Sequence, residues 1–175
     1  QPTIENLKSG LQKMDEFEPD LIVGIGDTEA LSAAKIMWLM YENPDLDVAA
    51  LAAGGEYPRW APAKLVLVTT AVEAGCECTP YAEVVDAGKK ICLNSYNLLP
   101  EMAVIDADYT DGLSGAEFKK GALQALKNAI AALVVPEVND YAKGYARDAV
   151  RIVFENLANL MADPAKDPVG CENLL

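Results

Sequence analysis

Apolar residues recur at two different spacings along the first 42 residues of the chain. In residues 3–17 they lie three or four positions apart, which is typical of a helix with one apolar stripe. Pro19 interrupts this pattern, and Leu21–Val23 then forms a continuous apolar run before Gly24. Such a run is typical of a central parallel strand that is buried on both faces. Residues 29–42 are apolar nearly all round, which predicts a helix packed between two layers.

The middle of the chain has the pattern of strands separated by loops. Residues 43–63 contain several prolines and a pair of glycines, which predict a loop. Residues 64–69 and 102–105 are continuous apolar runs and predict two more buried strands. The alternating segment 81–85 and the short segment 91–93 flank a glycine-containing turn, so we expect a hairpin there.

The spacing becomes helical in the last third of the chain. Ser114–Glu117 has the sequence of a capping box, in which a serine and a glutamate together close the start of a helix. Helices are predicted at 122–134 and 139–160, and the tail 161–175 is predicted to be a loop. The expected fold class is therefore α/β, with an all-helical segment at the end.

The charge of the chain excludes two classes of partner. The 175 residues include 14 basic and 27 acidic side chains, for a net charge of −13. This charge repels nucleic-acid phosphates and anionic lipids, so we expect no nucleic acid and no membrane as a partner. No apolar run approaches the roughly 20 residues of a membrane span, and no targeting segment is recognisable. We therefore expect a cytoplasmic protein.

Cysteine and histidine usage limits the chemistry further. The four cysteines, Cys76, Cys78, Cys92 and Cys171, are too few for a disulfide framework in a chain of this length. The spacing of Cys76 and Cys78 is shorter than in the usual zinc sites. The chain contains no histidine, the commonest metal ligand and the side chain best suited to proton transfer near neutral pH. We expect reduced thiols and no zinc site.

Six strings of residues carry a resemblance to known proteins: Phe17–Ile22, Ala33–Trp38, Val68–Thr70, Thr79–Tyr81, Pro100–Ala107 and Lys166–Val169. In order and in spacing they resemble the iron-dependent alcohol dehydrogenase family, and most closely the alcohol dehydrogenase half of bifunctional aldehyde–alcohol dehydrogenases. The resemblance implies a dehydroquinate synthase-like architecture. Residues 1–110 would then be a Rossmann-like domain that lacks its first βαβ unit, and 111–175 the start of a helical domain of the metal-binding type.

The resemblance implies a first cofactor loop at the start of the helix predicted at 29–42. The family has a glycine-rich loop there, whose backbone can approach a pyrophosphate at a helix N-terminus. Of its glycines only Gly26 remains, and the vestigial cofactor positions are Gly26, Asp27, Thr28 and Ser32. Asp27 and Glu29 now bring negative charge to this loop. Two interpretations stay open: a self-capped turn, with Glu29 as a helix cap, or a residual nucleotide site.

A second cofactor loop is implied at residues 69–77. Thr69, Thr70 and Glu77 match the family pattern, but its small, flexible Ser-Gly-Thr stretch is lost. Lys90 stands where the family has a lysine near the cofactor. Thr69, Thr70 and Lys90 therefore complete the vestigial cofactor positions, although an exposed lysine is usually just solvated.

The resemblance also implies a metal-binding helix, and here the chain departs from the family. Gln124 and Asn128 occupy the places of the family's Asp and His ligands, and Ala131 that of its Glu. Neutral amides are poor ligands for Fe²⁺ or Zn²⁺ compared with carboxylate and imidazole. We therefore expect no cofactor, neither iron nor zinc, and NAD(P) only at a residual site.

Three altered sites over preserved strand cores favour a pseudoenzyme. The first hypothesis is a catalytically inactive structural or interaction subunit, which binds a protein partner or forms a homo-oligomer through its helical segment. The alternatives are an NAD(P)-linked alcohol or aldehyde oxidoreductase fragment completed by another chain, and a nucleotide-binding regulatory module. The predicted helices 122–134 and 139–160 would form the contact, with the apolar residues 125–134, and Leu126 and Ile130 among them, exposed for it.

Overall fold

The computed structural model describes residues 2–51, 63–72, 75–163 and 167–175. Residue contacts divide the chain into two compact units. The first comprises Gln1–Thr69 and Cys76–Val104, and the second Thr70–Gly75 and Ile105–Leu175. In the described ranges, every helix is too short or too polar to span a bilayer.

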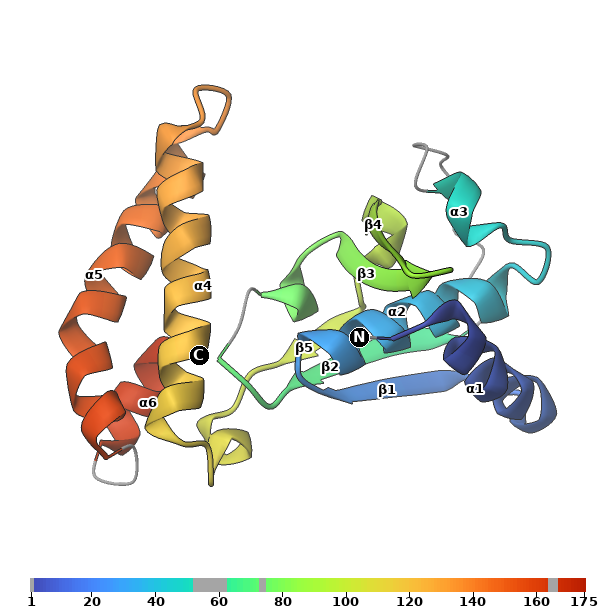
Figure 1. Ribbon diagram of the computed structural model, residues 1–175, viewed down its shortest axis with the longest axis horizontal. Helices are drawn as coiled ribbons and strands as arrows, with labels where there is room; N and C mark the ends of the chain where they lie inside the picture. The colour runs from blue at the N-terminus through green and yellow to red at the C-terminus, as the bar shows by residue number, and fades with distance from the viewer. Residues whose placement is uncertain (1, 52–62, 73–74, 164–166) are drawn as a thin grey trace. The chain divides into compact units, whose positions relative to one another are not determined.

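The first unit contains both strands and helices (Figure 1). In chain order they are α1 (Ile4–Phe17), β1 (Leu21–Gly26), α2 (Thr28–Glu42), α3 (Val48–Leu51), β2 (Lys64–Thr69), the 3-10 turn η1 (Cys76–Cys78), β3 (Tyr81–Asp86), β4 (Lys89–Asn94), the 3-10 turn η2 (Tyr96–Leu98) and β5 (Met102–Val104). Strands β1, β2 and β5 form a parallel sheet in that order, and β3 and β4 form an antiparallel hairpin. The predicted helix 3–17, the three apolar strands and the hairpin are thus all present.

Helix α2 lies between the sheet and the hairpin, as Figure 1 shows. One apolar cluster joins α2 to the sheet through residues such as Leu31, Trp38 and Leu67. A second cluster joins the opposite side of α2 to α1 and the hairpin, through Ile36 and Val84 among others. The prediction of a helix packed between two layers is confirmed, and the two layers explain why its sequence is apolar nearly all round.

The prediction that β1 is buried on both faces is wrong for this structure. β1 is the edge strand of the described sheet, and its side chains alternate in exposure. Leu21, Val23 and Ile25 are 49–58% exposed, whereas Gly24 is buried beneath α2. The described elements cover one face of β1, and an apolar sequence alone does not show whether a second layer is present.

The second unit is helical. It contains the 3-10 turn η3 (Ala107–Thr110) and the helices α4 (Gly115–Val134), α5 (Asp140–Ala162) and α6 (Pro168–Leu174). Helices α4 and α5 lie side by side along their lengths (Figure 1). The predicted capping box is present, because Ser114 accepts a hydrogen bond from the Glu117 N–H while the Glu117 carboxylate accepts one from the Ser114 N–H. The expected α/β fold with an all-helical end is confirmed.

The tail is not the predicted loop, because α6 forms within it. Asp167 caps this helix and Pro168 occupies its first turn. Leu174 is buried in the core of the second unit, beside Phe118 and Leu160. A seven-residue helix has little stability in isolation, so this packing decides its formation.

Candidate functional site

The turn between β1 and α2 keeps the geometry of a strand–glycine–helix connection. Gly26 ends the strand with a φ of +147°, a region that residues with a side chain rarely adopt. A Cβ at this position would also lie 2.6 Å from the Ala30 Cβ. The glycine is therefore needed for the helix to begin directly after the strand, whether or not a ligand binds.

Asp27, and not Glu29, caps helix α2. Its Oδ1 accepts a hydrogen bond from the Ala30 N–H at 3.0 Å. Glu29 lies exposed in the first turn of the same helix, where its negative charge is also favourable. A carboxylate thus already occupies the helix end where a diphosphate would bring like charge, which weakens the attraction of this turn for a pyrophosphate.

Ser32 and Thr69 are buried, with 1% and 4% of their surface exposed. The Ser32 hydroxyl accepts a hydrogen bond from the Glu83 N–H at 3.3 Å, which ties α2 to β3. Thr69 is the last residue of β2, and the half-buried Thr70 follows it as the first residue of the second unit. The assignment of these residues as vestigial cofactor positions stays a prediction.

Lys90 is ion-paired with a carboxylate of its own hairpin. Its Nζ contacts the Glu83 carboxylate on β3, and the same carboxylate accepts a hydrogen bond from the Tyr81 hydroxyl. The Tyr81 hydroxyl also lies 3.2 Å from the Cys92 Sγ, within hydrogen-bond distance. The four side chains form one polar cluster on a face of the hairpin. Of these four, only Lys90 was a candidate site residue from the sequence.

The pKa values of this cluster follow from its contacts. The hydrogen bond to Glu83 raises the pKa of Lys90, and the charge of Glu29 on α2 acts in the same direction. Burial, with the hydrogen bonds to Cys92 and Glu83, raises the pKa of Tyr81 far above its ordinary value. Lys90 therefore stays charged, but two carboxylates offset its charge, which lowers its attraction for an anionic ligand.

Lys35 has no exposed surface, and sequence reasoning missed it as a functional candidate. Its Nζ donates hydrogen bonds to the carbonyl oxygens of Cys76, Thr79 and Tyr81. Cys76 belongs to η1 and lies at the end of the second implied cofactor loop, Thr79 follows that loop, and Tyr81 begins β3. The available signal was one lysine within a helix that is otherwise apolar nearly all round.

Gln124 and Asn128 lie one helical turn apart on α4, half-buried and exposed respectively. Ala131, in the place of the family's Glu, is exposed on the same helix. Within the described ranges, no group of three or more Cys, Asp or Glu side chains is placed to hold a metal ion. The carboxamides of Gln124 and Asn128 are weaker ligands for Fe²⁺ than the carboxylate and imidazole that the resemblance implies there.

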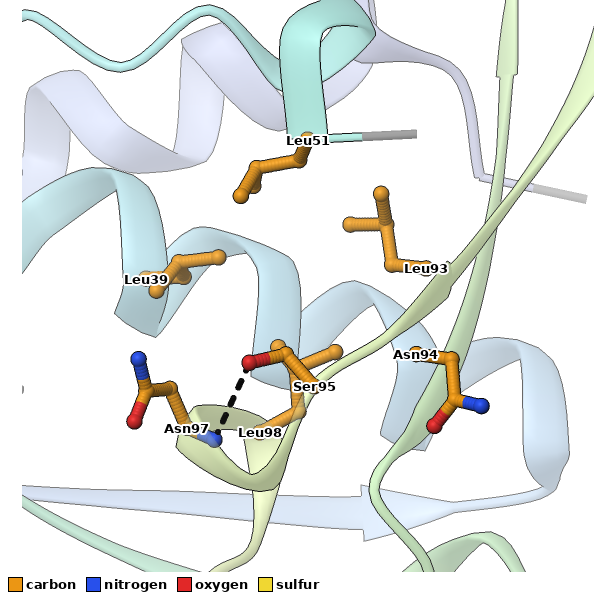
Figure 2. A pocket seen from close by; sticks show the side chains of 7 residues that line it. All are labelled: Leu39, Leu51, Leu93, Asn94, Ser95, Asn97 and Leu98. Carbon is orange, nitrogen blue, oxygen red and sulfur yellow. Dashed lines mark hydrogen bonds between the residues drawn. The ribbon is translucent and has the colours of Figure 1, made fainter. Parts of the chain in front are cut away.

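Two cavities lie apart from these positions. The first unit contains a cavity of about 10 Å³, which has room for about one water molecule. Figure 2 shows leucines on its walls and a hydrogen bond from the Asn97 N–H to the Ser95 hydroxyl. The second unit has an open cavity of about 310 Å³, whose walls include Asp108, Asp111 and Cys171.

Comparison with known proteins gives consistent matches. Residues 1–107 match the family described as iron-containing alcohol dehydrogenase. Aldehyde-alcohol dehydrogenase 2 of Entamoeba histolytica is 37% identical over 167 residues, which cover 89% of this chain and 19% of that protein. The bifunctional aldehyde-alcohol dehydrogenase of Escherichia coli K12 is 32% identical over 184 residues, which cover 99% of this chain and 21% of that protein. The chain thus spans about a fifth of these relatives.

Solved structures share the fold. The iron-containing alcohol dehydrogenase from Thermococcus thioreducens superposes with a TM-score of 0.91 at 19% identity, over 99% of this chain and 47% of that one. The sulfoacetaldehyde reductase from Bifidobacterium kashiwanohense, solved in complex with NAD⁺, gives a TM-score of 0.90 at 18% identity, over 99% and 46%. At these identities the likeness shows the fold alone.

The comparisons contradict the expectation of no cofactor and of neither iron nor zinc. The matching family is iron-containing by its description, and a protein of the same fold was solved with NAD⁺ bound. The expectation was drawn from single altered positions, and these do not decide what a whole family binds. Because the family match covers residues 1–107 of 175, and two relatives exceed 30% identity over most of the chain, the chain belongs to the iron-containing alcohol dehydrogenase family.

Proposed function

We propose that this chain serves as a structural and interaction part of an alcohol dehydrogenase-type protein and does not itself oxidise alcohols. The observation that carries this proposal is the pair Gln124 and Asn128 on α4. Both side chains are neutral carboxamides, which neither ionise near neutral pH nor carry a charge. The helix that carries them is nevertheless intact and well capped. A preserved scaffold without its reactive groups favours a role in packing or association.

Exposed apolar and aromatic side chains on the helices of the second unit support the interaction role. On α4, Ile130 is 49% exposed and Val134 71% exposed, one turn apart. On α5, Tyr141 is 85% and Tyr145 79% exposed, again one turn apart. Aromatic residues are enriched where proteins bind one another, so a protein partner fits this surface.

An assay of the purified chain tests the inactivity. With NAD⁺ or NADP⁺ and a short alcohol, and in reverse with NADH and acetaldehyde, we expect no turnover above background. The bifunctional enzyme of Escherichia coli is the positive control. The double variant Gln124→Asp with Asn128→His should stay inactive, because Ala131 and the altered loop at Asp27 remain. Turnover by the unmodified chain would overturn the proposal.

Association is tested separately by sedimentation of matched variants. Ile130→Asp should weaken association, because it places a charge on the exposed apolar surface of α4. Asn128→Asp adds the same charge at an exposed polar position of that helix and should leave association unchanged. Leu126 is packed against the core of the second unit, so Leu126→Asp is expected to destabilise the fold. Unchanged association in Ile130→Asp would contradict a contact through this face.

A second candidate is an NAD(P)-linked alcohol or aldehyde oxidoreductase completed by segments outside this chain. The strand–Gly26–helix turn favours it, since dinucleotides bind at such turns. NADH fluorescence distinguishes the two candidates. Binding that is strengthened by Asp27→Gly, which removes the capping carboxylate, would favour the oxidoreductase. Absence of binding in both forms would favour the structural role.

A further inference from the structure

Lys35 is a charged side chain at a position where the surrounding residues are apolar. It lies in the middle of α2 with no exposed surface, between the two apolar clusters of the first unit. Removing an ammonium group from water is strongly unfavourable unless its donors are satisfied. A methionine of similar length would avoid this cost, so packing alone does not account for a lysine here.

The ammonium group is fully satisfied by backbone oxygens. Its Nζ lies 2.5 Å from the Cys76 carbonyl oxygen, 2.5 Å from that of Thr79 and 3.0 Å from that of Tyr81. A lysine ammonium has three donors and no acceptor, so three carbonyls match it completely. The three oxygens converge on one point, as they do around a bound cation.

Neighbouring contacts connect the same two elements. Ser32 lies one turn before Lys35 on α2, and its hydroxyl is 3.7 Å from the Cys76 Sγ. The Cys76 thiol donates to the Tyr81 carbonyl at 3.7 Å and is only 3% exposed. Segment Cys76–Tyr81 is thus held on α2 by polar contacts that centre on the Lys35 charge.

We propose that Lys35 is a positioning residue: a tethered cation that occupies a carbonyl cradle and fixes the segment Cys76–Tyr81 against helix α2. This role goes beyond the proposed function and does not depend on it. Its consequence is local. The segment, which overlaps the end of the second candidate cofactor loop, is held on the helix that begins at the Gly26 turn, and both belong to the same compact unit.

The buried Cys76 thiol reports on this clamp. In a background with Cys78, Cys92 and Cys171 replaced by serine, labelling of Cys76 by a thiol reagent requires local opening of the segment. Lys35→Met leaves buried carbonyls without a donor, so labelling should accelerate by about tenfold or more. Lys13→Met, which removes an exposed lysine from α1, should leave the rate unchanged. An unchanged rate in Lys35→Met would overturn the proposal.

Chemical rescue separates a cation role from general packing. Lys35→Ala removes three carbons and the ammonium, which n-propylammonium replaces. We expect propylammonium chloride to slow Cys76 labelling in Lys35→Ala at least severalfold, and 1-propanol or tetramethylammonium chloride to have no such effect. Equal effects of the three additives would show that charge is not what the cradle requires.

A measurement on the unmodified chain applies if the variants do not fold. An ammonium held by three carbonyls in the protein interior exchanges its protons slowly with water. A nitrogen-selective NMR spectrum near neutral pH should therefore show one protected lysine ammonium signal that is absent from the exposed lysines. If no lysine gives such a signal, Lys35 is not held as proposed.

Discussion

Helices α2 and α4 are each the central helix of a compact unit, and they are fixed by opposite means. The charge of Lys35 draws three backbone carbonyls onto α2. On α4 the missing side chain of Gly121 lets a backbone approach, because a Cβ there would lie 1.5 Å from the Val72 carbonyl oxygen. One helix holds a neighbouring segment by a buried charge, and the other by leaving room for it.

The two kinds of contact should make the two helices respond differently to a substitution. Removing the charge of a polar clamp leaves its carbonyl partners without a donor but adds no atom that must be accommodated. A backbone contact at van der Waals distance has no flexible side chain to move aside, so an added atom must displace the main chain. The second unit should therefore be the more sensitive of the two to a single added carbon.

The largest effect is expected for Gly121→Ala. The added Cβ collides with backbone at Val72 and should lower the free energy of unfolding by about 3 kcal/mol, at the upper end of overpacking costs. Chemical denaturation followed by circular dichroism measures it. A change as small as that caused by substitutions at exposed positions would mean that Val72 moves away freely, and that α4 is not fixed by this contact.

A smaller effect is expected from the titration of Lys35, which makes the free energy of unfolding depend on pH. Burial lowers the pKa of Lys35 below its ordinary 10.5, although Cys76, Glu77 and Cys78 face it and raise the pKa when charged. Between the lowered value and 10.5 the unfolded chain binds more protons than the folded chain, so the free energy of unfolding rises with pH. This term cannot exceed about 1.4 kcal/mol per pH unit.

The test of this term is the difference between the unmodified chain and Lys35→Met across alkaline pH. The rise should be present in the unmodified chain and absent from the variant, in urea titrations performed at each pH. If the free energy of unfolding of the two chains depends on pH with the same slope, the Lys35 ammonium has an ordinary pKa. The buried charge would then not distinguish α2 from α4.

The capping box of α4 should contribute about 1 kcal/mol, the usual worth of an N-cap serine. Ser114→Ala removes the acceptor of the Glu117 N–H and should lower the free energy of unfolding by that amount. The backbone N–H and the hydroxyl of Ser114 both lower the pKa of Glu117, and only the hydroxyl is lost, so this pKa should return part of the way toward its ordinary value. Ser9→Ala, an exposed serine within α1, is the matched control and should change little.

The smallest effect is expected for Gly144→Ala, and its sign is opposite to that of Gly121→Ala. A Cβ at Gly144 would meet nothing within 4 Å. Alanine should raise the free energy of unfolding by about 0.5–1 kcal/mol, because glycine costs conformational entropy within a helix. Thermal unfolding of the two alanine variants in parallel gives the comparison, and the same sign for both would contradict the close approach at Gly121.

Much of the secondary structure could be predicted, and the errors share one cause. The capping box at Ser114 was predicted correctly because it depends on residues three positions apart. The exposure of Val23 and the helix containing Leu174 were not, because both depend on elements distant in the sequence. The division at residue 110 and the vestigial cofactor positions stay predictions.

At the candidate site, sequence identified residues but not their contacts. It drew attention to the carboxylates after Gly26, yet assigned the cap to Glu29, while the structure assigns it to Asp27. Either residue is chemically suited to the task, and the backbone path decides which one reaches the Ala30 N–H. The sequence indicated Lys90 as a candidate but not its ion pair with Glu83, which lies on the adjacent strand.

Residue identity and local spacing were enough to place the chain in its family and to predict the order of most helices and strands, whereas the assignment of Gln124 and Asn128 to the family's ligand places stays a prediction. The burial of Lys35 with three carbonyl partners and the close approach of the Val72 backbone to Gly121 became apparent only from the folded structure. Burial and close approach arise from segments that are distant in the sequence, and no local pattern of residues encodes them.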